Sequence, residues 1–203
     1  MIQIEIKNSD VIVRSIAEKL GSLSKDAPVV LKLAINETSN KTRTIMAQEA
    51  QKAYIMKLGS AKKYMKIKKA TATKPVAVIS SRGSPTLVND HKISPAKMQT
   101  GESRPNILKG KVLKKSKMNP LERNGIKAFL TKFTNSGLHN VGVVERVGRE
   151  RYPIKPLYSP AISQMLGSET NVLNVIQSEV GSILQKEITR QIDRRIRRER
   201  YVN

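Results

Sequence analysis

The sequence contains no cysteine and no tryptophan, and its aromatic side chains are limited to five tyrosines and two phenylalanines. Without cysteine the chain has no disulfide, no zinc–thiolate site and no thiol nucleophile. Proteins that bind single-stranded nucleic acid usually stack the bases on aromatic side chains. The low aromatic content therefore argues against that mode of binding and favours phosphate contacts that read no bases.

Long apolar segments are also missing. No apolar run approaches the roughly 18 residues that a membrane-spanning helix needs. The opening segment, MIQIEIKNSD, lacks the basic stretch and apolar core of a secretory signal. We therefore expect a protein that is assembled in the cytoplasm and has no membrane partner.

Acidic residues are scarce, with 16 Asp and Glu against 38 Lys and Arg in 203 residues, a net charge of +22. Such a chain repels copies of itself unless an acidic partner or a polyanion neutralises it. Nucleic acid is the usual polyanion, because neutralised phosphates release their counterions. The alternative is a highly soluble, solvated surface with no specific partner. The hydrophobic content of 38% predicts a thin core, with some apolar surface buried between subunits.

The sequence offers no catalytic constellation. The two histidines, His91 and His139, fall in expected loops, without further ligands at metal-binding spacing. No phosphate-binding glycine loop is present, and the acidic residues are too scattered to pair for acid–base chemistry. We therefore expect no enzyme activity, no metal and no cofactor. A nuclease that uses His139 is a minor alternative.

Residue periodicity predicts an α+β fold in a single domain, residues 1–203, with a small antiparallel β-sheet flanked by a long N-terminal helix and a long basic C-terminal helix. Alternating apolar residues predict strands at 1–7, 75–81 and 86–88. A β-hairpin is expected within 125–148, and its loop at 134–140 is a candidate docking tip.

Helical spacing predicts a short helix at 11–20 and a longer helix that Asp26 caps and that reaches about Leu58, where Gly59 stops it. The longer helix carries a stripe that includes Leu31, Ala34, Ile35 and Met46, and we expect this stripe to form core. Shorter and longer helices are expected at 161–166 and at about 169–200. Prolines, a glycine and polar residues indicate a long loop at 90–106. Three closely spaced prolines before the helix at 161–166 indicate an extended segment at a sheet edge.

Three basic clusters are candidates for contact with DNA or with an acidic partner. The first consists of Lys62, Lys63, Lys66, Lys68 and Lys69. The second consists of Lys109, Lys111, Lys114, Lys115 and Lys117. The third consists of Arg190, Arg194, Arg195, Arg197, Arg198 and Arg200. On a helix the arginines of the third cluster surround most of the circumference, which suits phosphate contact better than base readout. Any one cluster can also be only a solvated face.

Three segments resemble a known family. They are RERYPIKPLYSPAISQML, the preceding AFLTKF…SGLHNVGVVERVG, and the earlier KKYMKIKKATATKPVAVISSRGSPTLV. Their order along the chain resembles that in the minor tail protein Z family, the tail completion proteins of lambdoid long-tailed phages, and the resemblance covers residues 26–198. The family-like motif is carried by Arg151, Tyr152, Pro153, Ile154 and Pro160.

The resemblance implies a non-enzymatic structural protein of the virion, at the tail end or head–tail junction, that helps to finish the tail and position the DNA end. Its implied partners are tail tube, terminator or neck proteins, and double-stranded DNA in the lumen. Because tail tubes commonly have six-fold symmetry, we expect a hexameric ring whose copies, at +22 each, need negative partners or DNA. The alternative is a sequence-independent nucleic-acid-binding protein outside a virion.

Overall fold

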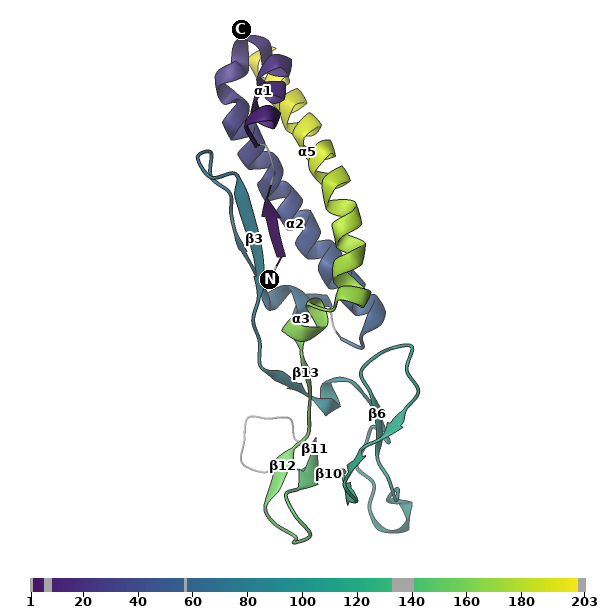
Figure 1. Ribbon diagram of the computed structural model, residues 1–203. Coiled ribbons are helices and arrows are strands. Elements are labelled where there is room, and N and C mark those ends of the chain that lie inside the picture. The colour runs from purple at the N-terminus through teal and green to yellow at the C-terminus, as the bar shows by residue number, and fades with distance from the viewer. Residues whose placement is uncertain (1, 6–8, 57, 133–140, 201–203) are drawn as a thin grey trace.

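The computed structural model describes residues 2–5, 9–56, 58–132 and 141–200, and these form an elongated molecule (Figure 1). Long helices lie side by side at one end, and short strands occupy the other end (Figure 1). We call the described residues within 2–81 and 162–200 the helical lobe, and the described residues within 85–161 the β lobe.

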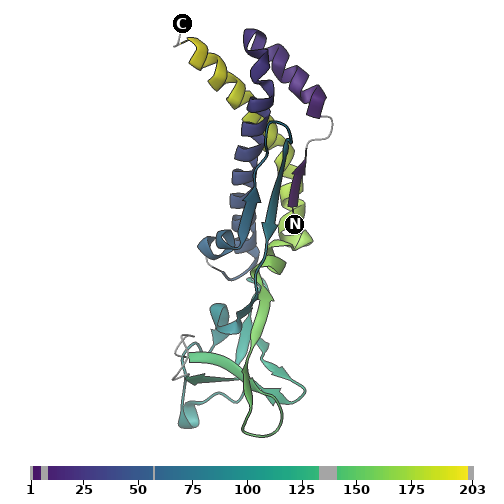
Figure 2. The ribbon, with the colours of Figure 1, turned by 90° about the vertical axis from the view of Figure 1, so that its left-hand side faces the viewer.

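The helical lobe is built around two long helices, α2 (Ala27–Ala53) and α5 (Asn174–Arg200), which pack along each other (Figures 1 and 2). A shorter helix, α1 (Ser9–Leu20), is followed by Gly21, whose φ of 57° lies in the left-handed region that glycine adopts without steric cost. A 3-10 segment, Gly21–Asp26, then leads into α2. One π-helical turn, Glu169–Leu173, precedes α5. The long helices predicted near both ends of the chain are therefore confirmed.

The apolar stripe predicted on α2 forms the core. Leu31, Ala34, Ile35 and Met46 recur at helical spacing, and all are buried. They belong to a core that continues onto α1, α5 and the sheet of this lobe. Burying a Leu or Ile side chain stabilises the fold by about 2 kcal/mol. The small residues Ala34 and Ala47 of α2 are likewise fully buried.

A three-stranded antiparallel sheet in the order β1–β3–β2 lies beside these helices. Its strands are β1 (Ile2–Glu5), β2 (Met65–Lys68) and β3 (Val76–Ser81). On the central strand Ala77 and Ile79 are buried in the helical core, so one face of the sheet is covered. A short helix, α3 (Leu58–Lys63), connects α2 to β2. The sheet and its flanking helices confirm the α+β class.

The β lobe consists of small antiparallel sheets. One pairs β4 (Pro85–Leu87) with β13 (Tyr158–Ala161), and a second has the order β5 (Lys92–Ser94), β6 (Lys109–Lys111) and β7 (Asn119–Pro120). A third pairs β8 (Glu122–Arg123) with β9 (Ile126–Lys127), and a fourth has the order β10 (Phe129–Lys132), β11 (Val141–Arg146) and β12 (Ile154–Pro156). Their shared core is small and is formed by Val88, Leu108, Ala128 and Val143.

Several predictions for this part of the chain are confirmed. β10 and β11 form the expected hairpin, although its loop at 134–140 lies outside the described residues. The proline-rich segment after it supplies β12 at the edge of the sheet, where a missing N–H is tolerated. The chain then enters α4 (Ile162–Leu166), as predicted. No helix in the described part of the chain is long and apolar enough to span a membrane.

Other predictions were wrong for tertiary reasons. Helix α2 ends at Ala53 and not near Leu58, because Tyr54 turns to an extended conformation and forms a β-bridge with Leu113. Gly59, predicted to stop that helix, lies inside α3. The segment at 90–106 is not one long loop, since it contains β5 and a 3-10 turn, Gly101–Ser103. Pairing with β6, which follows much later in the sequence, creates β5.

The role predicted for Asp26 was also wrong. The side chain of Asp26 makes no capping hydrogen bond to α2. Its carboxylate instead accepts hydrogen bonds from Arg195 of α5, with Nε 2.7 Å from Oδ2. An ion pair between helices has therefore replaced the local cap.

Candidate interfaces for DNA or an acidic partner

The third basic cluster lies on the last turns of α5, at the tip of the helical lobe. Two of its six arginines are engaged within the chain, since Arg195 pairs with Asp26 and Arg190 pairs with Glu187. The others are exposed and have no ion pair with any carboxylate among the described residues: Arg194, Arg197, Arg198 and Arg200. We call these four the tip arginines.

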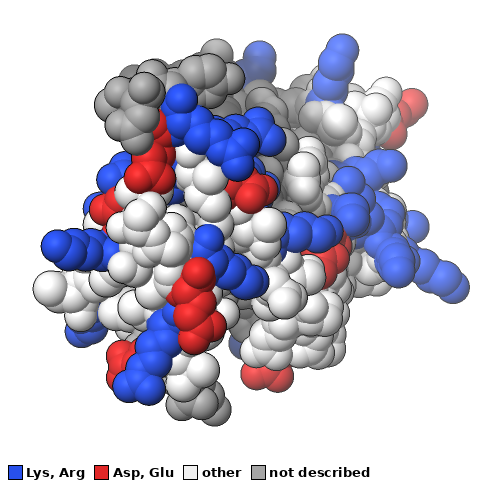
Figure 3. All heavy atoms as spheres, turned by 90° about the horizontal axis from the view of Figure 1, so that it is seen from above, with Lys and Arg blue, Asp and Glu red and all other residues white. Residues whose placement is uncertain are grey.

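The position of the tip arginines is favourable for helix formation and for binding anions. Cations in the last turns of a helix interact well with its dipole. The C-terminal end of α5 also diverges from α1 and α2, so it stands clear of its neighbours (Figure 2). From this end, Lys and Arg side chains project around the rim of the molecule, with fewer Asp and Glu between them (Figure 3). The tip is therefore a basic surface open to an outside partner.

The first cluster lies along an edge strand. Lys66 and Lys68 alternate on β2 with the buried Met65 and the half-buried Ile67, so the two lysines point to solvent. The other members, Lys62, Lys63 and Lys69, flank this strand at the end of α3 and before the next turn. Lysines on an edge strand also discourage pairing with strands of other molecules. The cluster therefore has a structural explanation beside the functional one.

The second cluster lies where the two lobes meet. Its segment packs on the C-terminal end of α2, where Ile55 N–H donates to the Val112 carbonyl and Lys114 N–H to the Ala53 carbonyl, each at 2.8 Å. The ammonium of Lys111 donates to the carbonyls of Lys114, at 2.9 Å, and Ser116, at 3.1 Å. Lys111 therefore closes its own turn, and the exposed members are Lys109, Lys114, Lys115 and Lys117.

The structure does not bring the three clusters into one patch. The N-terminal end of α2 lies beside the tip arginines, through the Asp26–Arg195 pair, and its C-terminal end lies beside the second cluster. A helix of 27 residues spans about 40 Å, so these two clusters are far apart. The tip arginines must therefore act separately from the second cluster, and the assignment of any cluster to DNA stays a prediction.

The family-like motif forms the end of the β lobe. Arg151, Tyr152 and Pro153 lie in the turn between β11 and β12, where the Arg151 guanidinium is 5.7 Å from the centroid of the Tyr152 ring. Ile154 begins β12, and Pro160 lies in β13. Tyr152 is 66% exposed. The motif therefore presents an exposed aromatic and cationic turn at the end opposite the tip arginines (Figure 1).

His91 holds the two lobes together. Its Nδ1 lies 2.7 Å from the Ile55 carbonyl oxygen, and its Nε2 lies 2.8 Å from Ser159 Oγ. In a catalytic triad a carboxylate orients the histidine, and the serine must reach the substrate. Here Nδ1 of His91 faces a backbone carbonyl instead of a carboxylate, and Ser159 is buried. We interpret His91 as a structural link. His139 lies outside the described residues, and in the part of the chain that is described no cluster of three or more acidic or histidine side chains could hold a metal ion.

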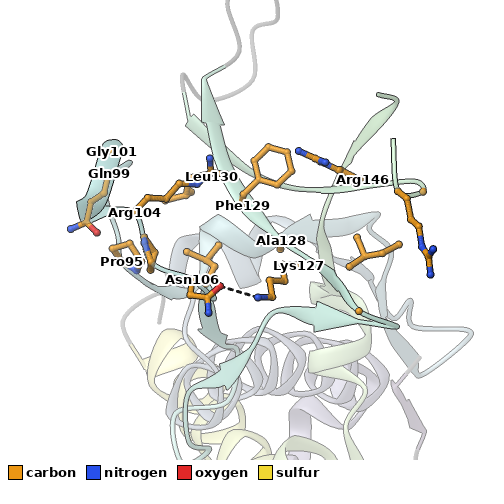
Figure 4. A pocket seen from close by; sticks show the side chains of 16 residues that line it. Pro95, Gln99, Gly101, Arg104, Asn106, Lys127, Ala128, Phe129, Leu130 and Arg146 are labelled. Carbon is orange, nitrogen blue, oxygen red and sulfur yellow. Dashed lines mark hydrogen bonds between the residues drawn. The ribbon is translucent and has the colours of Figure 1, made fainter. Parts of the chain in front are cut away.

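Sequence reasoning missed a basic pocket in the β lobe. It is a cavity of about 660 Å³ that Arg104, Lys127, Arg146 and Arg149 line together with apolar residues (Figure 4). These cations belong to none of the three clusters, because they come from segments that lie far apart in the sequence. The local sequence indicated one part of the pocket wall, the dipeptide Asn124-Gly125. This pair is typical of hairpin turns, and it forms the tight turn between β8 and β9.

Comparison with known proteins assigns the family. The family model of the prophage minor tail protein Z (GPZ) matches residues 13–200. No curated protein and no solved structure matches the chain. The matched region contains both long helices, the three basic clusters and the motif around Tyr152. The chain therefore belongs to the prophage minor tail protein Z family, and it is a structural protein of a phage tail, which it builds together with other tail proteins.

Proposed function

We propose that the protein completes the tail at the head–tail junction and helps to position the DNA end, and that it does so by binding and not by catalysis. The observation that carries this proposal is the exposure of the four tip arginines, which form no ion pair with a described carboxylate. Arginine side chains around a helix contact phosphates from any side without reading bases. Such contact suits a protein that must hold whichever sequence forms the DNA end.

The proposed assembly is a hexameric ring on the tail, built in the host cytoplasm and retained in the virion. Exposed apolar residues on the early helices are available for packing between copies, among them Val11, Val29 and Leu33. Six copies at +22 each repel one another in isolation. We therefore expect the ring to close on negative surfaces of tail tube, terminator or neck proteins, with DNA in its lumen.

A salt titration of DNA binding tests the role of the tip. Full-length protein is titrated with a short DNA duplex at several salt concentrations, as wild type and with Arg194, Arg197, Arg198 and Arg200 all changed to Gln. The matched control changes Lys63, Lys66, Lys68 and Lys69 to Gln, which removes the same charge from the first cluster. Each lost phosphate contact lowers the slope of log affinity against log salt by about 0.9. We expect the arginine variant to lower that slope by about 2 to 4 and the control by less than about 1.

Equal losses in the two variants would show that only net charge matters and would overturn the assignment to the tip. The ring is tested separately, by measuring mass and shape with light scattering and negative-stain imaging at low and high salt, with and without DNA and purified tails. A protein that stays monomeric throughout and binds neither tails nor DNA contradicts the proposal. Co-purification with ribosomes or chromosome instead of particles would favour a nucleic-acid-binding role outside the virion.

A further inference from the structure

The basic pocket of the β lobe brings together four cationic side chains from different segments of the chain. Arg104 comes from the segment after β5, Lys127 from β9, Arg146 from the end of β11 and Arg149 from the turn that follows. No acidic side chain lines the pocket, and within the described residues none of these four cations has a carboxylate partner. Cations held close together without counterions raise the free energy of the empty site, so an anionic ligand would be favoured there.

The Phe129 ring positions two of these cations. The guanidinium carbons of Arg104 and Arg146 lie 5.7 Å and 6.0 Å from the ring centroid. Such cation–π contacts orient the guanidinium groups and leave their N–H donors available. Lys127 is held in turn by Asn106, whose Oδ1 accepts a hydrogen bond from Nζ at 2.9 Å (Figure 4). The donors are therefore arranged before any ligand arrives.

Apolar side chains form another part of the wall, beside the polar Gln99 and Asn106. Leu108 and Ala128 are buried, and Ile126, Phe129 and Leu130 are half-buried. An occupant that satisfies both parts of the lining carries carboxylates beside an apolar side chain. A peptide segment has this chemistry. Duplex DNA does not fit as well, because it presents its phosphates on a convex cylinder and has no apolar side chain to place in a concave pocket.

We propose that this pocket binds an acidic peptide segment, with carboxylates next to an apolar side chain, from a neighbouring protein. The neighbouring protein is not a second copy of this chain, because no two acidic residues of its sequence are adjacent or separated by a single residue. Bidentate pairing of Arg104 and Arg146 with carboxylates would supply the affinity. That the neighbour is a tail protein rests on the proposed function, but the pocket acts independently of the tip arginines.

The test uses the full chain and a labelled ten-residue peptide in which glutamates alternate with leucines. Its control peptide replaces every glutamate by glutamine. The pocket variant is Arg104→Gln with Arg146→Gln, and the matched variant is Lys114→Gln with Lys115→Gln, which removes the same charge outside the pocket. Losing charge-assisted hydrogen bonds should weaken binding of the glutamate peptide by about tenfold or more, against about twofold for the matched variant.

A third variant, Lys127→Gln, keeps the test valid if the pocket variant fails to fold. Because Lys127 is exposed, this change should not disturb folding, and it should still weaken binding of the glutamate peptide severalfold. Equal weakening by the pocket and matched variants, or equal binding of the glutamine peptide, would overturn the proposal. If the pocket variant loses more of its binding to duplex DNA than of its binding to the glutamate peptide, the pocket is a phosphate site and the proposal is wrong. The tip-arginine variant should bind the peptide as the wild type does, so a failure of the DNA proposal can be told apart from a failure of the peptide proposal.

Discussion

The helical lobe and the smaller β lobe build their cores in different ways. In the helical lobe two contiguous clusters of buried side chains run along α2 and tie together α1, α5 and a sheet. In the β lobe the core cluster has Val88, Leu108, Ala128 and Val143 as its buried members, and the strands around it are short. Since buried apolar area provides most of the stability of a fold, the helical lobe should be the more stable part.

The two lobes also treat charge differently. In the helical lobe the one fully buried acidic side chain among the described residues, Glu187, receives Lys41 and Arg190 on its two carboxylate oxygens. In the β lobe Arg104 and Arg146 stack on a ring and have no carboxylate partner in the described chain. The charge of Glu187 therefore joins helices, whereas the two arginines beside Phe129 keep their charges available for a partner.

The largest expected effect comes from truncating equivalent leucines in the two cores. Leu31 and Leu108 are 1% and 3% exposed. Leu31→Ala should cost about 3 to 4 kcal/mol and lower the stability of the whole chain, whereas Leu108→Ala should cost about 2 kcal/mol, because the small core around it can relax. Chemical denaturation and amide hydrogen exchange measure both. If Leu108→Ala costs as much as Leu31→Ala and speeds exchange equally in both lobes, the two lobes are one cooperative unit.

The next effect concerns the buried carboxylate. Burial alone raises the pKa of Glu187, but hydrogen bonds from Lys41 and Arg190, and their charges, outweigh burial and lower this pKa below its usual 4.5. The ionised form therefore stabilises the fold above about pH 4.5, and this contribution is lost as pH falls through the lowered pKa. Glu187→Gln should cost about 2 kcal/mol at pH 7.

Melting temperatures between pH 3 and 7 check this prediction, and the gap between wild type and Glu187→Gln should narrow at the acidic end. The matched control is Glu49→Gln, which breaks the surface pair with Lys52, a side chain that is 73% exposed. Surface pairs contribute little, so the control should change stability by less than about 0.5 kcal/mol. A gap that stays constant with pH would show that Glu187 stabilises by packing alone.

A smaller effect should come from the link between the lobes. His91→Ala removes the hydrogen bonds to Ile55 and Ser159 and leaves a half-buried carbonyl and a buried hydroxyl without these partners, at a cost of about 1 to 2 kcal/mol. Small-angle scattering should also show a broader distribution of overall lengths. Thr86→Val removes the hydrogen bonds of the Thr86 hydroxyl to His91, Ser159 and Pro160 but leaves the His91–Ile55 contact between the lobes, so it should change the scattering less. Unchanged scattering in His91→Ala would mean that the backbone contacts between the lobes, such as the Tyr54–Leu113 bridge, fix the joint without His91.

The smallest effects are a pair of glycine substitutions with opposite signs. Gly125 has a φ of 74° in the turn that forms one wall of the pocket, so Gly125→Ala should destabilise the protein by about 1 kcal/mol. Gly59 lies in α3 with open space around an added Cβ, so Gly59→Ala should stabilise it by up to about 1 kcal/mol. Thermal unfolding measures both. Two changes of the same sign would contradict the backbone explanation.

Much of the fold could be read from local pattern. The apolar spacing of Leu31, Ile35 and Met46 predicted the buried face of α2, because a side chain's position on a helix follows from its sequence spacing. Apolar alternation predicted the β10–β11 hairpin, and prolines predicted the edge strand β12. The family resemblance was likewise carried by contiguous segments and is confirmed by the family match.

The long helices with their apolar faces, the β10–β11 hairpin, the excess of positive charge and the family resemblance all follow from the local sequence, since each depends on neighbours in the chain. The tertiary structure alone set where α2 ends, whether Asp26 caps a helix or pairs with Arg195, and which cations are engaged within the chain. It also decided that Arg104, Lys127 and Arg146 share one pocket. The physical reason is that pairing with distant residues, such as Leu113 with Tyr54, competes with local preference and leaves no local trace in the sequence.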